Sequence, residues 1–248
     1  MRNSPGMNSC LIVALAISMS LTSSAQEPKN LQVLPKDIQR DSLISIMRGF
    51  SFALGVRCQY CHVGGDGISF EGVEFDRDDD PDKVKARFMI QMTNRLNEET
   101  LPRLPFRDVP NVRIECKTCH RGRPRPVLLK QELRMIIEQF GVDSAIARYR
   151  ELRSGATMSG KFDFREWETN TLAEDLAKEG RLRDAIAVYR LNEEFFDKSF
   201  SIKYELATLY EEVGDKPEAI KYYKKALMII PDHTKSLQRL EVLQKQKP

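Results

Sequence analysis

Residues 58–62 read Cys-Gln-Tyr-Cys-His, and residues 116–120 read Cys-Lys-Thr-Cys-His. These two stretches hold every cysteine of the chain except Cys10, and two of its three histidines. Two thiols three positions apart reach the two vinyl groups of one porphyrin, and the histidine that follows then lies under the iron. The pattern predicts two covalently bound haem c groups, one at each motif.

Each residue of the two motifs has a role in this interpretation. The thiols form the thioethers, and each histidine is the proximal iron ligand. The predicted haem-attachment residues are Cys58, Cys61, Cys116 and Cys119, and the predicted proximal ligands are His62 and His120.

Three other uses of paired cysteines were weighed. The first is a structural disulfide within each pair, which suits an oxidising compartment. The second is one zinc ion held by four thiolates, but the gap between Cys61 and Cys116 is far wider than in a zinc ribbon. The third is a thioredoxin-like redox pair, which needs one active pair and a preceding strand. None of them explains why a histidine follows both pairs.

The ligand on the other side of each iron is less well defined. The third histidine, His233, lies in a Pro-Asp-His turn near the end of the chain, where a solvated turn residue is expected. Methionine is the other common haem ligand, and it raises the reduction potential relative to imidazole. The methionines beyond the N-terminal leader are Met47, Met89, Met92, Met135, Met158 and Met228.

Residues 1–25 have the pattern of a secretory signal peptide. Arg2 gives a positive start, residues 10–21 form an apolar run, and small residues precede a cut after Ala25. The run is too short to span a bilayer comfortably, although an uncleaved membrane anchor is the alternative. Cys10 opens the run instead of closing it, which argues against a lipid anchor. We therefore expect an exported, periplasmic protein.

Composition is that of an ordinary globular protein. The 248 residues are 41% hydrophobic and 30% charged, with a formal charge of +3. The small excess of positive charge and the lack of a long basic cluster argue against a nucleic-acid binder.

Helical periodicity frames both motifs. Apolar residues recur at helical spacing over residues 42–54, and Gly55 is placed to end that helix. Asp80-Pro81 predicts the N-cap and first turn of a second helix through about Asn97, with Val84, Phe88, Met89, Met92 and Leu96 on one face. Residues 63–80 form a loop, and residues 121–126 (RGRPRP) form a linker because proline cannot continue a helix.

The last third of the chain contains an internal repeat. The matched pairs are Ala173 with Ala207, Gly180 with Gly214, Ala185 with Ala219, Ile186 with Ile220, and Tyr189 with Tyr223. Their common spacing matches the period of about 34 residues that is typical of the tetratricopeptide repeat, as do small residues where helices touch and glycine at the turn. Residues 234–246 predict a capping helix. Residues 127–153 predict a helical segment that hints at a degenerate third unit.

These patterns together predict an all-α fold with little regular sheet. A multihaem c-type cytochrome module of helix–loop–motif units comes first, and a helical-hairpin repeat domain follows. The predicted divisions are a signal peptide at 1–25, a dihaem domain at 26–126, a helical connector at 127–165, and tetratricopeptide repeats with a capping helix at 166–248.

The N-terminal half resembles the cytochrome c subunit of photosynthetic reaction centres. The likeness covers about residues 30–125, in the order of that family. It lies in residues 30–35 (NLQVLP), 53–62 (ALGVRCQYCH), 86–93 (ARFMIQMT), 96–97 (LN) and 116–122 (CKTCHRG). The family carries four haems in two pairs, whereas this chain has two motifs and adds a repeat domain. These departures argue against a photosynthetic role and favour another periplasmic electron chain.

The resemblance implies that the helix before each motif supplies the second iron ligand. By that likeness Met47 ligates the first iron and Met89 the second, with Met92 as the alternative to Met89. It further implies an electron carrier, not an enzyme, whose partners are redox proteins and a membrane redox complex such as a reaction centre. The repeats would dock a protein partner. A peroxidase-like haem enzyme and a binding scaffold with structural haems are the alternatives.

Overall fold

The computed structural model describes residues 28–105, 112–155 and 160–245. The predicted signal peptide therefore lies outside the described residues, as does Met158. Helices dominate, and a single antiparallel pairing of two short strands is the only sheet in the described ranges. None of the helices in these ranges is long and apolar enough to cross a bilayer.

The N-terminal part, residues 28–126, contains three α-helices, short helical turns and the strand pair. Helix α1 spans Arg40–Leu54, α2 spans Pro81–Arg95 and α3 spans Cys116–His120. The turns are η1 (Cys58–Tyr60), η2 (Leu96–Thr100, a π-helical turn) and η3 (Leu101–Arg103). Strands β1 (Val63–Gly64) and β2 (Val73–Glu74) pair with Val63 opposite Glu74.

The ends of α1 and α2 follow the sequence signals. Gly55 caps α1 in the left-handed region at φ 69°, as expected. The Asp80 side chain accepts a hydrogen bond from the backbone N–H of Asp82 at 2.8 Å, and Pro81 is the first residue of α2. Helix α2 ends at Arg95 instead of Asn97, because the chain widens there into the π-helical turn.

The C-terminal part, residues 127–245, is a row of helical hairpins. Its helices are α4 (Leu129–Phe140), α5 (Val142–Ser154), α6 (Glu166–Lys178), α7 (Leu182–Glu193), α8 (Phe200–Glu212), α9 (Lys216–Ile229) and α10 (Thr234–Lys245). One apolar core runs through them from Leu129 to Leu243. Helices α4 and α5 form a hairpin that contributes to this same core.

The repeat period is visible in the backbone. Arg181 N–H donates to Leu176 C=O at 2.9 Å, and Asp215 N–H donates to Tyr210 C=O at 2.8 Å. Both bonds close the same turn, one repeat period apart, around a glycine with positive φ, Gly180 or Gly214. The two turns share this form because only glycine adopts the conformation at no steric cost.

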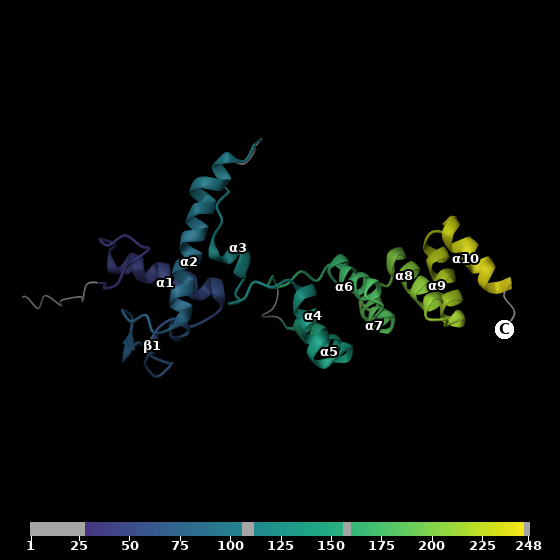
Figure 1. Ribbon diagram of the computed structural model, residues 1–248, viewed down its shortest axis with the longest axis horizontal. Helices are drawn as coiled ribbons and strands as arrows, with labels where there is room; N and C mark the ends of the chain where they lie inside the picture. The colour runs from purple at the N-terminus through teal and green to yellow at the C-terminus, as the bar shows by residue number, and fades with distance from the viewer. Residues whose placement is uncertain (1–27, 106–111, 156–159, 246–248) are drawn as a thin grey trace, which may run out of the picture.

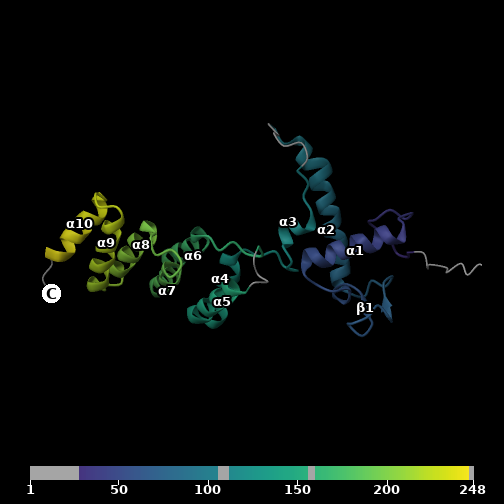
Figure 2. The same ribbon diagram turned by 180° about the vertical axis from the view of Figure 1, so that it is seen from behind.

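The two parts lie at opposite ends of an elongated molecule. Figure 1 and Figure 2 show α1–α3 at one end and α8–α10 at the other, with α4–α7 between them. The linker predicted at residues 121–126 contains no helix and joins the two parts.

Candidate functional site

The first motif directly follows the cap of α1. Cys58 opens the turn η1, Cys61 ends it, and His62 leads into β1. The His62 ring packs edge-on against Phe75 at a centroid distance of 5.1 Å. Its Nδ1 atom is buried and has no hydrogen-bond partner among the described residues. Burial, followed by the charge of Lys83, lowers the pKa of His62, so the ring is neutral at pH 7, the form that binds a metal.

The second motif forms the short helix α3. The Glu115 side chain accepts a hydrogen bond from the backbone N–H of Thr118, and the Thr118 hydroxyl accepts one from the backbone N–H of Glu115. This capping box fixes the start of the helix, so Cys116 and Cys119 lie one turn apart.

His120 is oriented by the backbone that follows it. Its side chain is buried, and Nδ1 lies 2.8 Å from the carbonyl oxygen of Arg123. A carbonyl only accepts, so Nδ1 carries the proton and Nε2 keeps its lone pair. Such a bond is the usual way in which a protein sets the tautomer of a metal-ligating histidine. His120 is therefore prepared to bind iron through Nε2.

A backbone contact joins the two motifs. Gly122, two positions after His120, donates its N–H to the carbonyl oxygen of Ala53 at 2.8 Å. Ala53 lies in the last turn of α1, directly before the first motif. A Cβ built on Gly55 would lie 2.3 Å from the carbonyl oxygen of Gly122, so only glycine permits this approach.

Asn97 ties the second motif to the end of α2. Its side-chain amide donates to the carbonyl oxygens of Thr93 and Ile114, and its Oδ1 accepts from the N–H of Ile114, with both contacts to Ile114 at 2.8 Å. The chain just ahead of Cys116 is thus held against the helix that carries Met89. The sequence offered no local signal for this role beyond the Leu96-Asn97 likeness.

The three candidate methionines lie on the helices that precede the motifs. Met47 is in α1, and Met89 and Met92 are in α2; all three are half-buried. The hydroxyl of Thr93 bonds the carbonyl oxygen of Met89 at 2.8 Å. His233 lies between α9 and α10, at the end of the molecule far from α1–α3 (Figure 1), so it belongs to the repeats.

The apolar face expected on α2 is present but uncovered by protein. Val84 and Phe88 are 51% and 59% exposed, whereas Lys83 is the buried residue of the helix. The Lys83 ammonium donates to the carbonyl oxygens of Phe75 and Arg77 and pairs with Asp78 at 3.1 Å. Lys83 therefore anchors the loop to α2, a function that hydrophobic periodicity did not predict.

The rival uses of the cysteines find little support in this geometry. All four thiols are free, and among the described residues no three His, Cys, Asp or Glu side chains gather as a metal site would require. Burial, with Asp80 and Asp82, raises the pKa of Cys61 to about 11, and burial raises that of Cys116. A redox-active dithiol has a lowered pKa instead.

The exposed apolar side chains of the N-terminal part fit a large flat apolar group. Among the described residues, every buried apolar side chain except Ala53 lies at position 129 or beyond. The large apolar side chains exposed in the N-terminal part are Ile44, Phe52, Tyr60, Ile68, Phe70, Phe75, Val84, Phe88, Leu104 and Val112. A domain of this size needs an apolar core. Two porphyrins, held by thioethers and by His62 and His120, would supply it.

Comparison with known proteins agrees with this chemistry. Residues 22–139, just under half of the chain, match the family model described as photosynthetic reaction centre cytochrome C subunit. The N-terminal part of this chain is similar to reaction centre c-type cytochromes. That similarity implies covalently bound haem c. Residues 200–233 match the tetratricopeptide repeat. The expected resemblance and the helical fold class are thereby confirmed.

Two curated relatives cover only parts of their own length. The chain is 35% identical over 74 residues to cytochrome c-554 of Chloroflexus aurantiacus, covering 30% of this chain and 16% of that protein. It is 30% identical over 99 residues to the photosynthetic reaction center cytochrome c subunit of Rubrivivax gelatinosus, covering 36% of this chain and 25% of that protein. The chain thus aligns with a quarter or less of each relative.

Proposed function

We propose that this chain is an exported c-type cytochrome that binds two haem groups and transfers electrons. One observation carries the proposal: His62 and His120 each follow a free Cys-x-x-Cys pair as a buried imidazole, and the ring of His120 is fixed by the Arg123 carbonyl. The thiols of Cys58 and Cys61 would hold one haem, and those of Cys116 and Cys119 the other.

The second ligand of each iron is proposed from the helices before the motifs. Met47 would ligate the first iron and Met89 the second, with Met92 as the alternative. Asn97 supports the second assignment, because it holds the second motif against the end of the methionine-bearing helix. When bound, haem supplies one-electron redox chemistry, and the protein sets its ligands, burial and orientation.

Electron transfer is favoured over enzymatic turnover by the residues around the motifs. A peroxidase would need a distal acid–base group, and in the described residues His233 is far from both motifs. Redox proteins, including a membrane redox complex, are the proposed partners. The periplasm is the proposed location, because Cys-x-x-Cys-His motifs follow a segment with signal-peptide pattern.

The test is the mass and the absorption spectrum of the protein purified from a periplasmic extract. Two covalent haems add two haem masses to the polypeptide cut after Ala25, and reduction sharpens the visible bands. Replacing Cys58 and Cys61 with Ala should remove one haem mass and leave the other. A colourless protein with the mass of its amino acids alone would overturn the proposal.

A further inference from the structure

Two tyrosines at equivalent repeat positions have different surroundings. Tyr223 donates its hydroxyl hydrogen to Glu211 at 2.9 Å. Tyr189, one repeat period earlier, is 1% exposed, and its hydroxyl has no hydrogen-bond partner among the described residues. The residue one repeat period before Glu211 is Ala177, which offers no acceptor. A buried hydroxyl without a partner costs stability, so its retention indicates a partner from outside the chain.

Two carboxylates lie close to this hydroxyl. Burial, followed by the charges of Glu205 and Glu174, raises the pKa of Tyr189. Burial and the charge of Glu174 likewise raise the pKa of the half-buried Glu205. Neither glutamate forms an ion pair or a side-chain hydrogen bond within the part of the chain that the structure describes.

Another half-buried glutamate of the repeats shows the usual arrangement. Glu193 accepts hydrogen bonds from Tyr222 at 2.7 Å and from Lys225 at 3.1 Å, and pairs with Lys203 at 3.0 Å. Burying a carboxylate is unfavourable unless a cation or donors compensate it. Glu205 lacks that compensation, so its surroundings fit a cation supplied by a ligand.

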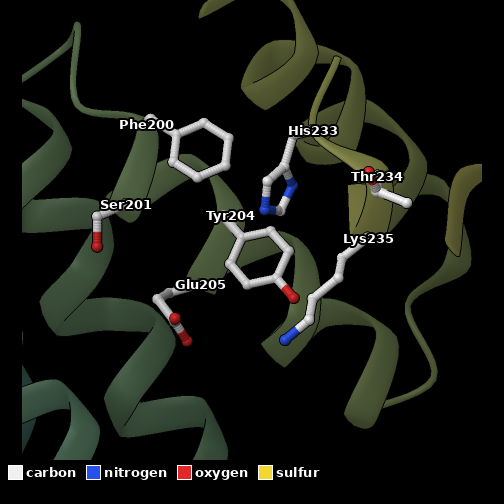
Figure 3. Close-up of a pocket in the computed structure, with 7 residues that line it drawn as sticks. All are labelled: Phe200, Ser201, Tyr204, Glu205, His233, Thr234 and Lys235. Atoms are coloured by element: carbon white, nitrogen blue, oxygen red, sulfur yellow. The ribbon is translucent and has the colours of Figure 1, made fainter. Parts of the chain in front are cut away.

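Glu205 lines a groove with an aromatic wall. Figure 3 shows the rings of Phe200, Tyr204 and His233 gathered beside it, with Lys235 on the opposite side. Phe200 and Tyr204 stack at a centroid distance of 5.9 Å, and His233 meets them edge-on at 4.7 and 5.0 Å. Aromatic faces beside a carboxylate favour a guanidinium or ammonium group, and they cover the methylenes of its side chain.

We infer that this groove binds an arginine or lysine side chain of a partner protein. Glu205 and Glu174 pair with its cation, the Tyr189 hydroxyl adds an acceptor, and the aromatic wall covers its stem. The inference deepens the proposed docking role of the repeats and rests on it. Charge complementarity selects the partner, because all three polar groups accept hydrogen bonds and the carboxylates are negative. Lys235 opposes the ligand's charge, so its removal should tighten binding.

The test uses the full-length haem-loaded protein and two fluorescein-labelled peptides, Leu-Arg-Leu-Arg-Leu and its twin with glutamine for arginine. Fluorescence anisotropy should show the arginine peptide binding about tenfold more tightly, as expected for a charged hydrogen-bonded contact. Glu205→Gln should remove this preference, and Lys235→Gln should increase it. Glu241→Gln, an equal charge change on α10, should leave it unchanged. Equal affinity for both peptides, or an unchanged preference in Glu205→Gln, would overturn the inference.

Tyr189→Phe separates a binding role from a structural one. It should weaken the arginine peptide severalfold while leaving the urea midpoint of unfolding in place, because the native hydroxyl makes no internal bond. Tyr223→Phe should lower that midpoint and keep the peptide preference. Tighter binding of a third peptide, with glutamate for arginine, would assign the groove to acidic ligands and contradict the inference. A normal haem spectrum without an arginine preference refutes the groove alone, whereas a colourless protein that keeps the preference refutes the haem proposal alone.

Discussion

The two predicted proximal histidines are held in different ways. His120 bonds the backbone carbonyl of Arg123, which fixes its tautomer. His62 has a buried Nδ1 without a partner in the described residues and is held by packing against Phe75. The imidazole of His120 is therefore the better oriented ligand, and its carbonyl bond makes it the more basic one. We expect the two irons to have different reduction potentials for this reason.

Met47→Ala tests the ligand of the first iron. The haem should stay attached through Cys58 and Cys61, but its iron should bind carbon monoxide and its potential should fall, by a fraction of the ~0.8 V range that axial ligands span. Optical redox titration measures this. Met228→Ala, at a site 83% exposed in α9, is the control. A titration identical to that of the unmodified protein would remove Met47 as a ligand.

Helix termini bring the two motifs together. The end of α1 precedes the first motif and accepts a hydrogen bond from Gly122, just after the second. Gly55 permits this contact in two ways, because its φ of 69° suits glycine and because its missing Cβ leaves room for the Gly122 carbonyl. The junction therefore depends on one residue without a side chain.

Two glycine substitutions in the same region test this junction. Gly55→Ala should destabilise the protein by about 2 kcal/mol or more, from the left-handed conformation and the collision with Gly122. Gly49→Ala, inside α1 with nothing within 4 Å of the added Cβ, should stabilise it by about 0.5–1 kcal/mol. Urea unfolding followed by circular dichroism measures both. Equal effects of the two substitutions would show that the contact is unimportant.

The repeat helices are joined by an ion network around Glu193. Burial alone would raise the pKa of this carboxyl, but hydrogen bonds from Tyr222, Lys203 and Lys225 outweigh burial and lower it to about 2. The folded pKa is thus below the ordinary value of 4.5, so the stabilisation is present above pH 4.5 and is lost as the pH falls toward 2.

Glu193→Gln should abolish that part of the acid sensitivity. At pH 7 it should also destabilise the protein by about 3 kcal/mol, because the buried ammonium of Lys203 loses its counter-charge. Thermal unfolding at pH 7 and at pH 3 measures the difference. Glu241→Gln, an exposed site on α10, is the matched control and should change neither value. A variant that keeps the full acid loss of stability would contradict the assignment to Glu193.

At the scale of the whole molecule, two parts with different kinds of interior meet at one aromatic contact. The guanidinium of Arg123 lies over the ring of Phe162 at 3.8 Å, and it also donates to the carbonyl oxygen of Val127. Burial lowers the pKa of Arg123. Because the carbonyl of the same residue orients His120, this contact links the repeats to the second motif.

Phe162→Ala should loosen the link between the two parts. The lost packing should cost about 3 kcal/mol, and the particle should show a larger maximum dimension in small-angle X-ray scattering, because Arg123 loses its aromatic partner. Phe140→Ala, at a side chain 68% exposed, should leave the scattering curve unchanged. Superposable curves for Phe162→Ala and the unmodified protein would mean that other contacts set the arrangement.

The sequence by itself determined the features that depend on local spacing. Thiols three apart with an adjacent histidine, the glycine that ends α1, the Asp80-Pro81 start of α2 and the repeat period all follow from the order of residues along the chain. Covalent geometry and backbone conformation act over short stretches, so a pattern of residue types was enough to predict them.

Only the tertiary structure decided which distant groups meet. The carbonyl that orients His120, the Asn97 amide that holds the second motif, and the missing acceptor beside Tyr189 depend on contacts between separate elements. Hydrophobic periodicity marked the face of α2 with Val84 and Phe88 but not its exposure, nor the burial of Lys83. Periodicity reports which residues share a face, whereas burial depends on what packs against that face.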